Sequence, residues 1–593
     1  TIFHRRLLRE LNGAIDAAIF YGLSGIAFLI AVVFVQEFIT LPFFNLRFLI
    51  GYYYLAFTLC DDFFSMLALI GLGAALFRRV VLRPSSVTTS RNEYLAFFLI
   101  LSFLILGFLQ NALRIAISSN PEFEIWAPVS YGLAGIFSFG SEGFLSPIHS
   151  VVWWLHSAAG LTLVALGASY YMRRLTVSLL NIYGCPPTGR VRSVKYSVSM
   201  SGGPAAKSIL DFPAKQLMDL DACTGCGRCQ DACPAFLAEK PLSPKKVIAD
   251  LSRCLDEHVR AVDPRSGVLA DYVKNDEIWS CTLCAACAES CPSYINHMQK
   301  IVDMRRGSDA VPEGYALAMT MISEKGSTVE DDDFRSTWFE GIDGVQTLAA
   351  FAGAEYLYFA GCGVGEESGK ASARATLSLL RAAGVSVGVL GAEERCCGDA
   401  ALRAGNDKLF KETAAANLER IAHYGVKQIV TSCPHGYNIL NKEYRALAKE
   451  LGVDASYSVV HHTQLLQALN ESGQLKTAAA NHHPVTFHDP CFLGRYNDEY
   501  DAPRALLASS NAIVIEMPRS QREGLCCGGH LRWNGTEGDA LAEFRARDLY
   551  SSGARVAITA CPHCVTMLRR GLAAIGATSV TVCDIAEYLA GGI

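Results

Sequence analysis

The chain has 593 residues, enough for about three or four domains, and its net charge of -5 comes with no basic stripe that would suggest a nucleic-acid partner. Its hydrophobic fraction of 51% excludes a protein that is soluble throughout. Long apolar runs are confined to residues 1–180, and the remainder has the composition of an ordinary soluble protein.

Four apolar stretches near the N-terminus are long enough to cross a bilayer. They cover about Ala14–Phe38, Phe48–Phe77, Tyr94–Ile117 and Ile148–Met172. At a helical rise of about 1.5 Å, about twenty residues cross a hydrocarbon core of about 30 Å. We therefore expect an all-α transmembrane bundle over residues 1–183. The first stretch is too long for a cleavable signal and is expected to remain as a span.

Basic residues flank these stretches asymmetrically. They precede the first span, separate the second from the third, and follow the fourth: Arg5, Arg6, Arg9, Arg78, Arg79, Arg83, Arg91, Arg173 and Arg174. The two other loops carry only Arg47, with Glu122, Glu124 and Glu142 on the longer one. The positive-inside rule then places both the N-terminus and the large C-terminal region in the cytoplasm. The longer loop is partly apolar over Tyr131–Phe139 and could dip into the lipid without crossing it.

Several polar residues lie inside the expected spans, where each is costly and needs a reason. Asp61 and Asp62 are near the middle of the second span, and Gln110, Asn111 and Arg114 are toward the outer end of the third. For Arg114 a helix–helix hydrogen bond explains the residue as well as a function does. Quinone reduction needs a proton with each electron, so we expect a proton path to quinone through Asp61 or Asp62, with Arg114 as a further candidate.

Histidines are scarce in this region. A b-type heme between two helices needs an axial ligand from each helix. His149 and His156 lie on one helix, about 10 Å apart by helix rise, and cannot clamp one heme between them. The first three spans offer no histidine, and His4 is the only other one before residue 183. Heme b stays an open alternative, with His149 and His156 as ligands that would each need a partner from another helix.

Two identical cysteine patterns follow the membrane region. Each reads CxxCxxCxxxCP, first at Cys223, Cys226, Cys229 and Cys233 and then at Cys281, Cys284, Cys287 and Cys291. Three thiolates at this spacing hold three corners of a cubane [4Fe-4S] cluster, and the fourth reaches across to the other cluster. We therefore expect one cluster on Cys223, Cys226, Cys229 and Cys291 and a second on Cys281, Cys284, Cys287 and Cys233. Zinc favours separated CxxC pairs, and disulfide frameworks suit short secreted chains.

This ferredoxin-like module is expected over residues 184–310, with a mostly helical insert at Ala235–Ser280. Cys254 in the insert has no partner at a ligand spacing and is interpreted as a core thiol. No role is assigned to Cys60, Cys185 or Cys583.

A segment is then repeated once, from about Ala354 onward. The first copy carries Cys362, Cys396-Cys397-Gly398 and Cys433-Pro434-His435-Gly436, and the second carries Cys491, Cys526-Cys527-Gly528 and Cys561-Pro562-His563-Cys564. Both copies alternate helical stretches with short apolar runs, namely Tyr356–Ala360, Val385–Leu390 and Gln428–Thr431, then Val485–His488, Ala512–Glu516 and Val556–Thr559. The pattern predicts two α/β units, residues 350–475 and 480–593, whose strand ends present the cysteines on loops.

The region from about Leu217 to Asp584 resembles the heterodisulfide reductase family in its D-type subunit, in which a duplicated cysteine-rich CCG domain follows a two-cluster ferredoxin domain. The resemblance rests on both CP-terminated runs, both CCG groups and the segment His488-Asp489-Pro490-Cys491. It implies a noncubane [4Fe-4S] cluster on a five-cysteine motif, which the second copy completes with Cys491, Cys526, Cys527, Cys561 and Cys564. The first copy has Gly436 in the fifth place. Its Cys362, Cys396, Cys397 and Cys433 could hold a four-thiolate cluster or be a metal-free relic.

Residues 1–183 look like the cytochrome b membrane domain, similar to the gamma subunit of nitrate reductase, that is fused to such modules. The matching segments are Arg78–Pro84, Ala112–Ala116, Trp153–His156 and Leu180–Tyr183. The family usually carries a histidine in the second span and another beyond the last. Here those places read Thr58–Asp62 and Tyr171–Arg174, without histidine.

The nearest resemblance of the whole chain is to electron-transferring flavoprotein:menaquinone oxidoreductases. It implies an iron–sulfur oxidoreductase of the cytoplasmic membrane, within a multisubunit complex, linking a cytoplasmic donor such as electron-transferring flavoprotein to menaquinone. The expected order is donor, noncubane cluster, the two ferredoxin clusters, then quinone, with the ferredoxin domain against the membrane surface if heme is absent. The alternatives are a quinol-dependent thiol–disulfide reductase and an electron-relay subunit without its own substrate. No GxGxxG follows a clear strand, so neither flavin nor nicotinamide is expected in this chain.

Overall fold

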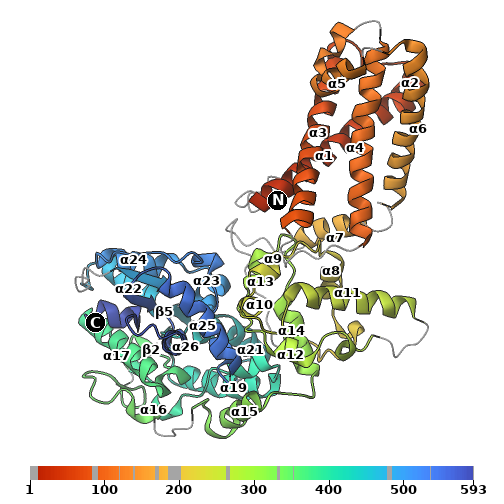
Figure 1. Ribbon diagram of the computed structural model, residues 1–593. Coiled ribbons are helices and arrows are strands. Elements are labelled where there is room, and N and C mark those ends of the chain that lie inside the picture. Colours follow the sequence, from red (N-terminus) through yellow and green to blue (C-terminus); the bar gives the residue numbers. More distant parts are fainter. Residues whose placement is uncertain are drawn as a thin grey trace. The chain divides into compact units, whose positions relative to one another are not determined.

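The structure, a computed structural model, describes residues 11–82, 91–118, 121–137, 140–166, 172–183, 202–261, 267–329, 334–351, 353–476, 484–533 and 536–591. It divides into two compact units with the boundary between Val177 and Ser178, and each unit is described by itself (Figure 1). His4, Arg5, Arg6, Arg9, Arg83 and Cys185 lie outside the described residues, as do the side chains of Arg91, Arg173 and Arg174.

The N-terminal unit contains four helices that are long and apolar enough to cross a membrane, as the sequence predicts. They are α1 (Leu11–Phe34), α3 (Tyr52–Phe77), α4 (Arg91–Ile117) and α6 (Glu142–Leu166). Short segments extend the first two, namely η1 (Val35–Thr40) and α2 (Leu41–Phe44) after α1, and η2 (Arg78–Leu82) after α3. The predicted start of the fourth span, Ile148, is too late, because α6 begins before Pro147 and keeps this proline near its start, where it removes a single backbone hydrogen bond.

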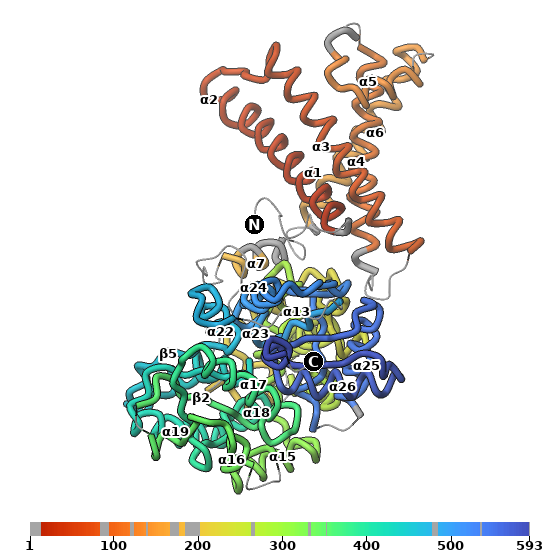
Figure 2. The backbone as a smooth tube through the Cα atoms, turned by 90° about the vertical axis from the view of Figure 1, so that its left-hand side faces the viewer, coloured from red at the N-terminus to blue at the C-terminus, as the bar shows by residue number. Residues whose placement is uncertain are grey.

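Helix α1 packs along α3, and α4 packs along α6 (Figures 1 and 2). Glycines permit the close approach of α1 and α3. A Cβ added to Gly22 would lie 2.7 Å from the Cβ of Ala68, and one added to Gly71 would lie 2.8 Å from Cγ1 of Ile19. Small residues at helix contacts are typical of membrane bundles, where lipid gives no hydrophobic drive for association. Large apolar side chains are exposed on the outside of the unit, among them Phe28, Phe63, Ile70, Leu161 and Val164.

The C-terminal unit begins with short helices separated by loops. They are the last residues of α7 (Met172–Tyr183), then α8 (Ala214–Asp221), α9 (Arg228–Asp231), α10 (Pro234–Leu237), α11 (Pro244–Arg260), α12 (Asn275–Trp279), α13 (Ala286–Ser290), α14 (His297–Gly307), α15 (Glu313–Lys325) and α16 (Phe334–Thr337). The cysteines of the two CxxCxxCxxxCP runs lie on or beside α9, α10 and α13. This arrangement agrees with the predicted helical iron–sulfur region.

Two all-parallel sheets follow. The first has the order β1-β3-β2-β4-β5, with β1 (Gln346–Thr347), β2 (Tyr356–Tyr358), β3 (Val387–Val389), β4 (Gln428–Thr431) and β5 (Ser458–His461). The second has the order β6-β7-β8, with β6 (Val485–His488), β7 (Val556–Thr559) and β8 (Thr581–Asp584). Helices α17 (Glu367–Ala382), α22 (His462–Glu471) and α26 (Pro562–Ala574) contact the strands. Helix α24 (Asp501–Ser509) packs on α22, α25 (Thr536–Tyr550) packs on α26, and α19 (Asp407–His423) lies between β3 and β4 in the chain. The predicted α/β character of both copies is therefore confirmed.

The two sheets share one topology. The order β3-β2-β4-β5 in the first copy corresponds to Val514, β6, β7 and β8 in the second, because Val514 forms a parallel bridge with Val485 at the place of β3. The predicted strand over Ala512–Glu516 is wrong to this extent, since the segment makes one isolated bridge and is not a strand. Pairing here is limited to the backbone bonds of Val485 with Ile513 and Ile515. A continuous hydrophobic core joins the ferredoxin-like region to both copies.

Candidate iron-sulfur site

The parallel strands place the repeated cysteines at one edge of each sheet. Cys362 follows the end of β2 and Cys433 follows β4, while Cys491 follows β6 and Cys561 follows β7. Ligand sites in open parallel sheets form beyond the carboxyl ends of the strands. The fold therefore gathers cysteines that are far apart in the sequence.

The CCG turn has the same conformation in both copies. Gly398 has φ +82° and Gly528 has φ +84°, a left-handed region that favours glycine. The N–H of Gly398 donates to Sγ of Cys396 at 3.5 Å, and the N–H of Gly528 donates to Sγ of Cys526 at 3.4 Å. Each glycine thus turns a backbone donor toward the first sulfur of its cysteine pair, which stabilises that sulfur as a thiolate.

The second copy brings its five predicted cysteines together. Cys491, Cys526, Cys527, Cys561 and Cys564 line one small cavity of about 10 Å³. The Sγ atoms of Cys527 and Cys564 are 3.3 Å apart. Hydrogen bonds from Cys284 and Cys491 hold the pKa of Cys526 below its usual value, and those from Cys526 and Cys564 do the same for Cys527. Buried thiols with lowered pKa values favour metal binding, since the thiolate is the ligand.

The ferredoxin-like region places its cysteines in the predicted crossed arrangement. Burial raises the pKa of Cys291 to about 12, and Cys226 and Cys223 from the first run add to this shift. Burial also raises the pKa of Cys233, with contributions from Cys284 and Cys281 of the second run. The fourth cysteine of each run therefore lies beside the other run.

The second ferredoxin set also borders the second copy. The thiol of Cys284 is in hydrogen-bonding contact with that of Cys526, and both pack in one cluster of buried side chains with Ala286. Arg495 fixes this junction: its Nε donates to the carbonyl of Cys284 at 2.6 Å, and its Nη1 donates to that of Gly524 at 2.6 Å. The two cysteine groups share a wall.

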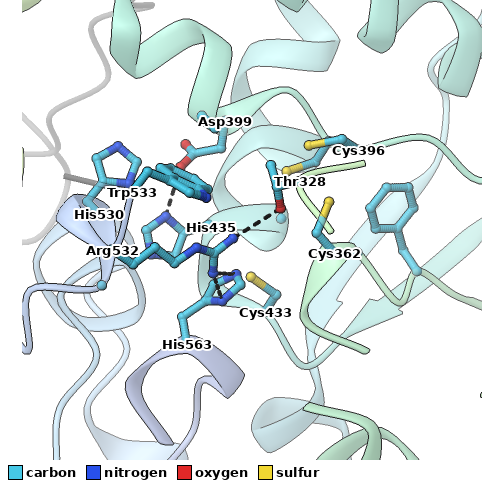
Figure 3. A pocket seen from close by; sticks show the side chains of 16 residues that line it. Thr328, Cys362, Cys396, Asp399, Cys433, His435, His530, Arg532, Trp533 and His563 are labelled. Atoms are coloured by element: carbon cyan, nitrogen blue, oxygen red, sulfur yellow. Dashed lines mark hydrogen bonds and ion pairs between the residues drawn. The ribbon is translucent and has the colours of Figure 1, made fainter. Parts of the chain in front are cut away.

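The first copy keeps the electrostatic features of a metal site despite its missing cysteine. Cys362, Cys396, Cys397 and Cys433 line one cavity of about 40 Å³ (Figure 3). Arg335 is buried, forms an ion pair with Glu394 at 3.0 Å, and donates from Nη2 to Sγ of Cys362 at 3.7 Å. Hydrogen bonding to Cys396 and then burial raise the pKa of Cys362, and the Arg335 guanidinium opposes them.

The opposite wall of this cavity is built from side chains that the sequence patterns did not single out as ligands. His435, His530 and His563 line it together with Arg532 and Trp533 (Figure 3). The three histidines also line the second cavity, so they separate the two cysteine groups. The repeated Cys-Pro-His segment was the signal for His435 and His563, whereas nothing in the spacing singled out His530 or Arg532.

His435 and His563 occupy equivalent positions in the two copies but contact side chains of opposite charge. Nδ1 of His435 lies 2.8 Å from the carboxylate of Asp399, which Arg403 also contacts at 3.1 Å. Burial alone would raise the pKa of Asp399, but Arg403 and then His435 hold it below its usual value. His563 instead contacts the guanidinium of Arg532, and burial followed by this charge lowers the pKa of His563.

The polar residues of the membrane unit form one network that includes Asp62 and Arg114. Asp62 is buried and accepts hydrogen bonds from the backbone N–H of Val129 at 2.7 Å and of Ser130 at 3.1 Å, and from the Ser130 hydroxyl at 2.7 Å. It thereby caps α5 (Pro128–Ala134), a short apolar helix in the loop where the sequence suggested a dip toward the lipid.

Arg114 anchors the other end of the network. Its two Nη atoms contact the carboxylate of Glu124 at 2.6 and 2.9 Å. Asn111 accepts from Arg114 at 2.8 Å and donates to the Ser130 hydroxyl at 3.1 Å. In the described part of the chain, Asp61 makes no hydrogen bond and lies outside this network.

Among the described residues of this unit, no two histidines are placed on different helices to clamp one heme. His149 and His156 both lie on α6, and within the described residues of this unit no other histidine faces them. Nδ1 of His156 lies 3.1 Å from the carbonyl oxygen of Phe103, and its ring stacks on that of Phe103 at 4.4 Å. The contact with Phe103 occupies Nδ1 of His156 and fixes the orientation of its ring against α4.

The remaining cysteines divide by burial. Cys254 and Cys583 are buried in the core of the C-terminal unit, as predicted for Cys254, and Cys60 is exposed on α3. Every cysteine that the structure describes is free of disulfide bonding. Groups of four or five thiols that are buried or partly buried, with backbone N–H groups aimed at some of their sulfurs, fit iron–sulfur clusters.

Family comparisons agree with this geometry. The cysteine-rich domain CCG matches residues 356–441 and 485–569, and the 4Fe-4S dicluster domain matches residues 219–295. The chain is 32% identical to the EtfAB:quinone oxidoreductase of Syntrophomonas wolfei, covering 91% of this chain and 82% of the relative. It is 29% identical to the probable iron-sulfur-binding oxidoreductase FadF of Bacillus subtilis, covering 99% and 90%. It is also 28% identical to the D-type subunit of the dihydromethanophenazine:CoB--CoM heterodisulfide reductase of Methanosarcina barkeri, covering 64% and 95%.

Proposed function

The chain belongs to the family of iron–sulfur oxidoreductases that includes the EtfAB:quinone oxidoreductase of Syntrophomonas wolfei, and from this premise we propose that it passes electrons between a cytoplasmic flavoprotein and membrane menaquinone. The proposed donor is of the electron-transferring flavoprotein type. The proposed setting is the cytoplasmic membrane, with the N-terminus and the iron–sulfur domains facing the cytoplasm, within a larger complex. The proposed domains are the transmembrane domain over residues 1–183, the ferredoxin-like domain over residues 184–310, and the two cysteine-rich domains over residues 350–475 and 480–593.

One observation carries this proposal: the cysteine groups form a row. The five-cysteine group of the second copy touches the second ferredoxin set through Cys526 and Cys284. The two ferredoxin sets then interlock. Burial raises the pKa of both Cys229 and Cys287, Cys233 of the second set adds to the shift of Cys229, and Cys229 of the first set adds to the shift of Cys287. Iron–sulfur clusters on these thiolates would supply one-electron carriers at close spacing.

The first ferredoxin set forms one end of this row. It lies beside the residues at which the chain enters the C-terminal unit. The hydroxyl of Ser178 lies 2.9 Å from that of Ser293, and Nδ2 of Asn181 donates to the carbonyl of Ser293 at 2.8 Å. Ser293 follows Cys291 by two residues. We infer that the cluster on Cys223, Cys226, Cys229 and Cys291 exchanges electrons with quinone, because the chain leads from this set toward the spans.

Protons for quinone chemistry are assigned to the membrane unit. Asp62 is already engaged by three hydrogen bonds, so Asp61 is the better candidate for the proton path. Arg114 is assigned to holding the loop after α4, through Glu124.

The test is quinol reduction of the clusters in the full chain, reconstituted in proteoliposomes. Adding a menaquinol analogue to the oxidised protein should produce [4Fe-4S] electron paramagnetic resonance signals, and a reduced electron-transferring flavoprotein should produce them from the other side. Cys291→Ser should remove the quinol-dependent signal, while Cys254→Ser, at a buried thiol outside the cysteine sets, should leave it. An iron-replete protein with no quinol-reducible signal would contradict the proposal.

A second candidate function is quinol-dependent thiol–disulfide reduction. It is favoured by the two small cavities beside the cysteine groups, both of which are lined by His435, His530 and His563. Reduction of a disulfide takes two electrons and two protons and yields two thiols. Disulfide-dependent oxidation of the prereduced clusters, without any flavoprotein, would support this candidate.

A further inference from the structure

The first cysteine group differs from the second by one donor at a known place. Gly436 occupies the position that Cys564 fills in the second copy, where its sulfur lies 3.3 Å from that of Cys527. The first copy therefore offers four protein thiolates where the second offers five. Its cavity is also larger, about 40 Å³ against about 10 Å³.

The missing cysteine is not excluded by the backbone. Gly436 lies inside α20 (Pro434–Asn438) and is absent from the described positions with positive φ. A Cβ added there would meet the hydroxyl of Thr431 at 3.6 Å and the Cβ of Cys433 at 3.8 Å, both ordinary contacts. The Cβ of a cysteine would therefore fit at this position without moving its neighbours.

The rest of the first group is preserved as a metal site would require. The CCG turn keeps the left-handed glycine and its N–H···S bond, and buried Arg335 still donates to Cys362. A buried guanidinium is costly unless its hydrogen bonds are satisfied by charged partners. A metal-free relic would have no need for this arrangement around a neutral thiol.

The wall formed by the histidines and Arg532 carries one loosely paired guanidinium, that of Arg532. Arg532 contacts His563, donates to the hydroxyl of Thr328 at 3.2 Å, and reaches Glu366 only at 3.9 Å. Asp399 is the acidic group on this wall, and its charge is matched by Arg403 at 3.1 Å. The carboxylate partner of Arg532 is thus more distant than that of Arg403, and its guanidinium is suited to holding a small anion.

We propose that the first cysteine group holds a noncubane [4Fe-4S] cluster of the kind that the resemblance implies for the five thiolates of the second copy, and that the coordination position left by Gly436 binds a small monodentate anion from solution, held by Arg532. This deepens the proposed function by assigning an exogenous ligand site to one cluster of the row. No electron or proton moves in the binding step.

The first test is metal content and spectroscopy of the full chain. Wild-type protein should contain about sixteen irons, four for each of four [4Fe-4S] clusters, and Cys433→Ser should lower this to about twelve. Cyanide should shift one electron paramagnetic resonance signal in a saturable way, acetonitrile should not, and Cys433→Ser should abolish the shift. About twelve irons in wild-type protein, or no cyanide-dependent shift, would overturn the proposal.

Position 436 supplies the matched pair of variants. Gly436→Cys restores the fifth thiolate and should remove the cyanide response with about sixteen irons retained, since no cluster is lost. Gly436→Ala fills the same space without a donor and should keep the response. A cyanide response that survives in an iron-replete Gly436→Cys protein would sink the idea.

A second pair of variants covers the case in which Gly436→Cys fails to assemble. Arg532→Gln should raise the cyanide concentration at half-saturation by about tenfold, and Arg532→Lys, which keeps the charge, should change it less. Equal responses of the two variants would contradict the assignment of Arg532. Quinol reduction measured on the same samples reports on the proposed function separately, because the ligand site and the quinone site are tested by different reagents.

Discussion

The thiol of Cys284 lies in hydrogen-bonding contact with the thiol of Cys526, although the two residues belong to different sequence motifs. One is in the second ferredoxin run and the other begins the CCG group of the second copy. Arg495, which is buried, donates to the carbonyl of Cys284 and carries its charge beside both groups. This contact makes the wall between the two cysteine groups the place where their redox properties are coupled.

Arg495→Gln should lower the reduction potentials of the clusters on both sides of this wall. A positive charge about 6 Å away at an effective dielectric constant of about 20 stabilises an added electron by about 2–3 kcal/mol, so we expect a fall of about 50–100 mV after partial relaxation. Potentiometric titration followed by electron paramagnetic resonance measures the change.

Arg495→Lys is the matched control, because lysine keeps the positive charge but lacks the several N–H donors of the guanidinium group. Its potentials should stay closer to those of the wild type than those of Arg495→Gln do. Equal potentials in all three proteins would show that the charge of Arg495 does not influence the clusters.

Gly528→Ala should prevent assembly at the second copy. Gly528 has φ +84°, a conformation that disfavours alanine. An added Cβ would also lie 2.6 Å from the carbonyl oxygen of Gly538, a backbone atom that cannot move without shifting the main chain. We expect a loss of about four irons per chain, the content of one [4Fe-4S] cluster. The neighbouring Gly529→Ala is the control, since its Cβ would meet Cys527 Sγ at an ordinary 3.5 Å. Iron content at wild-type level in Gly528→Ala would refute the requirement for glycine.

His297 should make the C-terminal unit less stable in mild acid. Burial lowers its pKa to about 4, against a usual value of 6.5. Between these values the unfolded chain binds a proton that the folded chain does not, so stability is full above pH 6.5 and falls as the pH drops toward 4, by about 3 kcal/mol in total. Melting temperatures of the intact protein measured from pH 7 to pH 5 should show this fall.

His297→Gln should flatten this pH dependence, because the substituted side chain does not titrate. His423→Gln is the control, since His423 is exposed at the end of α19. Parallel curves for wild type and His297→Gln would assign the acid sensitivity to other groups.

Substitutions of Asp62 and Asp61 should have different effects: the first should destabilise the membrane unit, and the second should slow quinone reduction. Asp62→Asn replaces an acceptor of three hydrogen bonds and turns an amide donor toward backbone N–H groups, which should cost about 1–3 kcal/mol. The melting temperature in detergent and protease sensitivity of the loop after α4 report this loss. Asp61→Asn should leave both unchanged and slow quinone reduction. Unimpaired quinone reduction in Asp61→Asn would remove the proposed proton path.

The grouping of the cysteines could be predicted from the sequence because their spacings are short and each pattern occurs twice. The crossed arrangement of Cys291 and Cys233 and the duplication of the α/β unit follow from two repeated patterns. The same holds for the four apolar helices, whose length is set by the bilayer.

Relationships that depend on tertiary packing could not be predicted in this way. The sequence made Asp62 a candidate proton carrier. Its role as a hydrogen-bond acceptor could not be predicted, because the donor Ser130 lies 68 residues later in the chain. The segment Ala512–Glu516 has the apolar character of a strand, but its position at the sheet edge leaves it with one bridge. Arg532 and His530 follow a CCG group without any spacing that would mark them, and only the folding of one copy against the other brings them to the cavity of the first.

The final turn of α7 has a practical consequence for dissecting the protein. Asn181 is fully buried, and its amide donates to Asp219, the carboxylate that neutralises the equally buried Lys300. A water-soluble version cut just before Cys223 would lose Asp219 together with Asn181 and leave the buried Lys300 without the carboxylate that it contacts. A truncation before Ser178 keeps Asn181, Asp219 and Lys300 together. We therefore expect a fragment that begins at Ser178 to fold as the intact C-terminal unit.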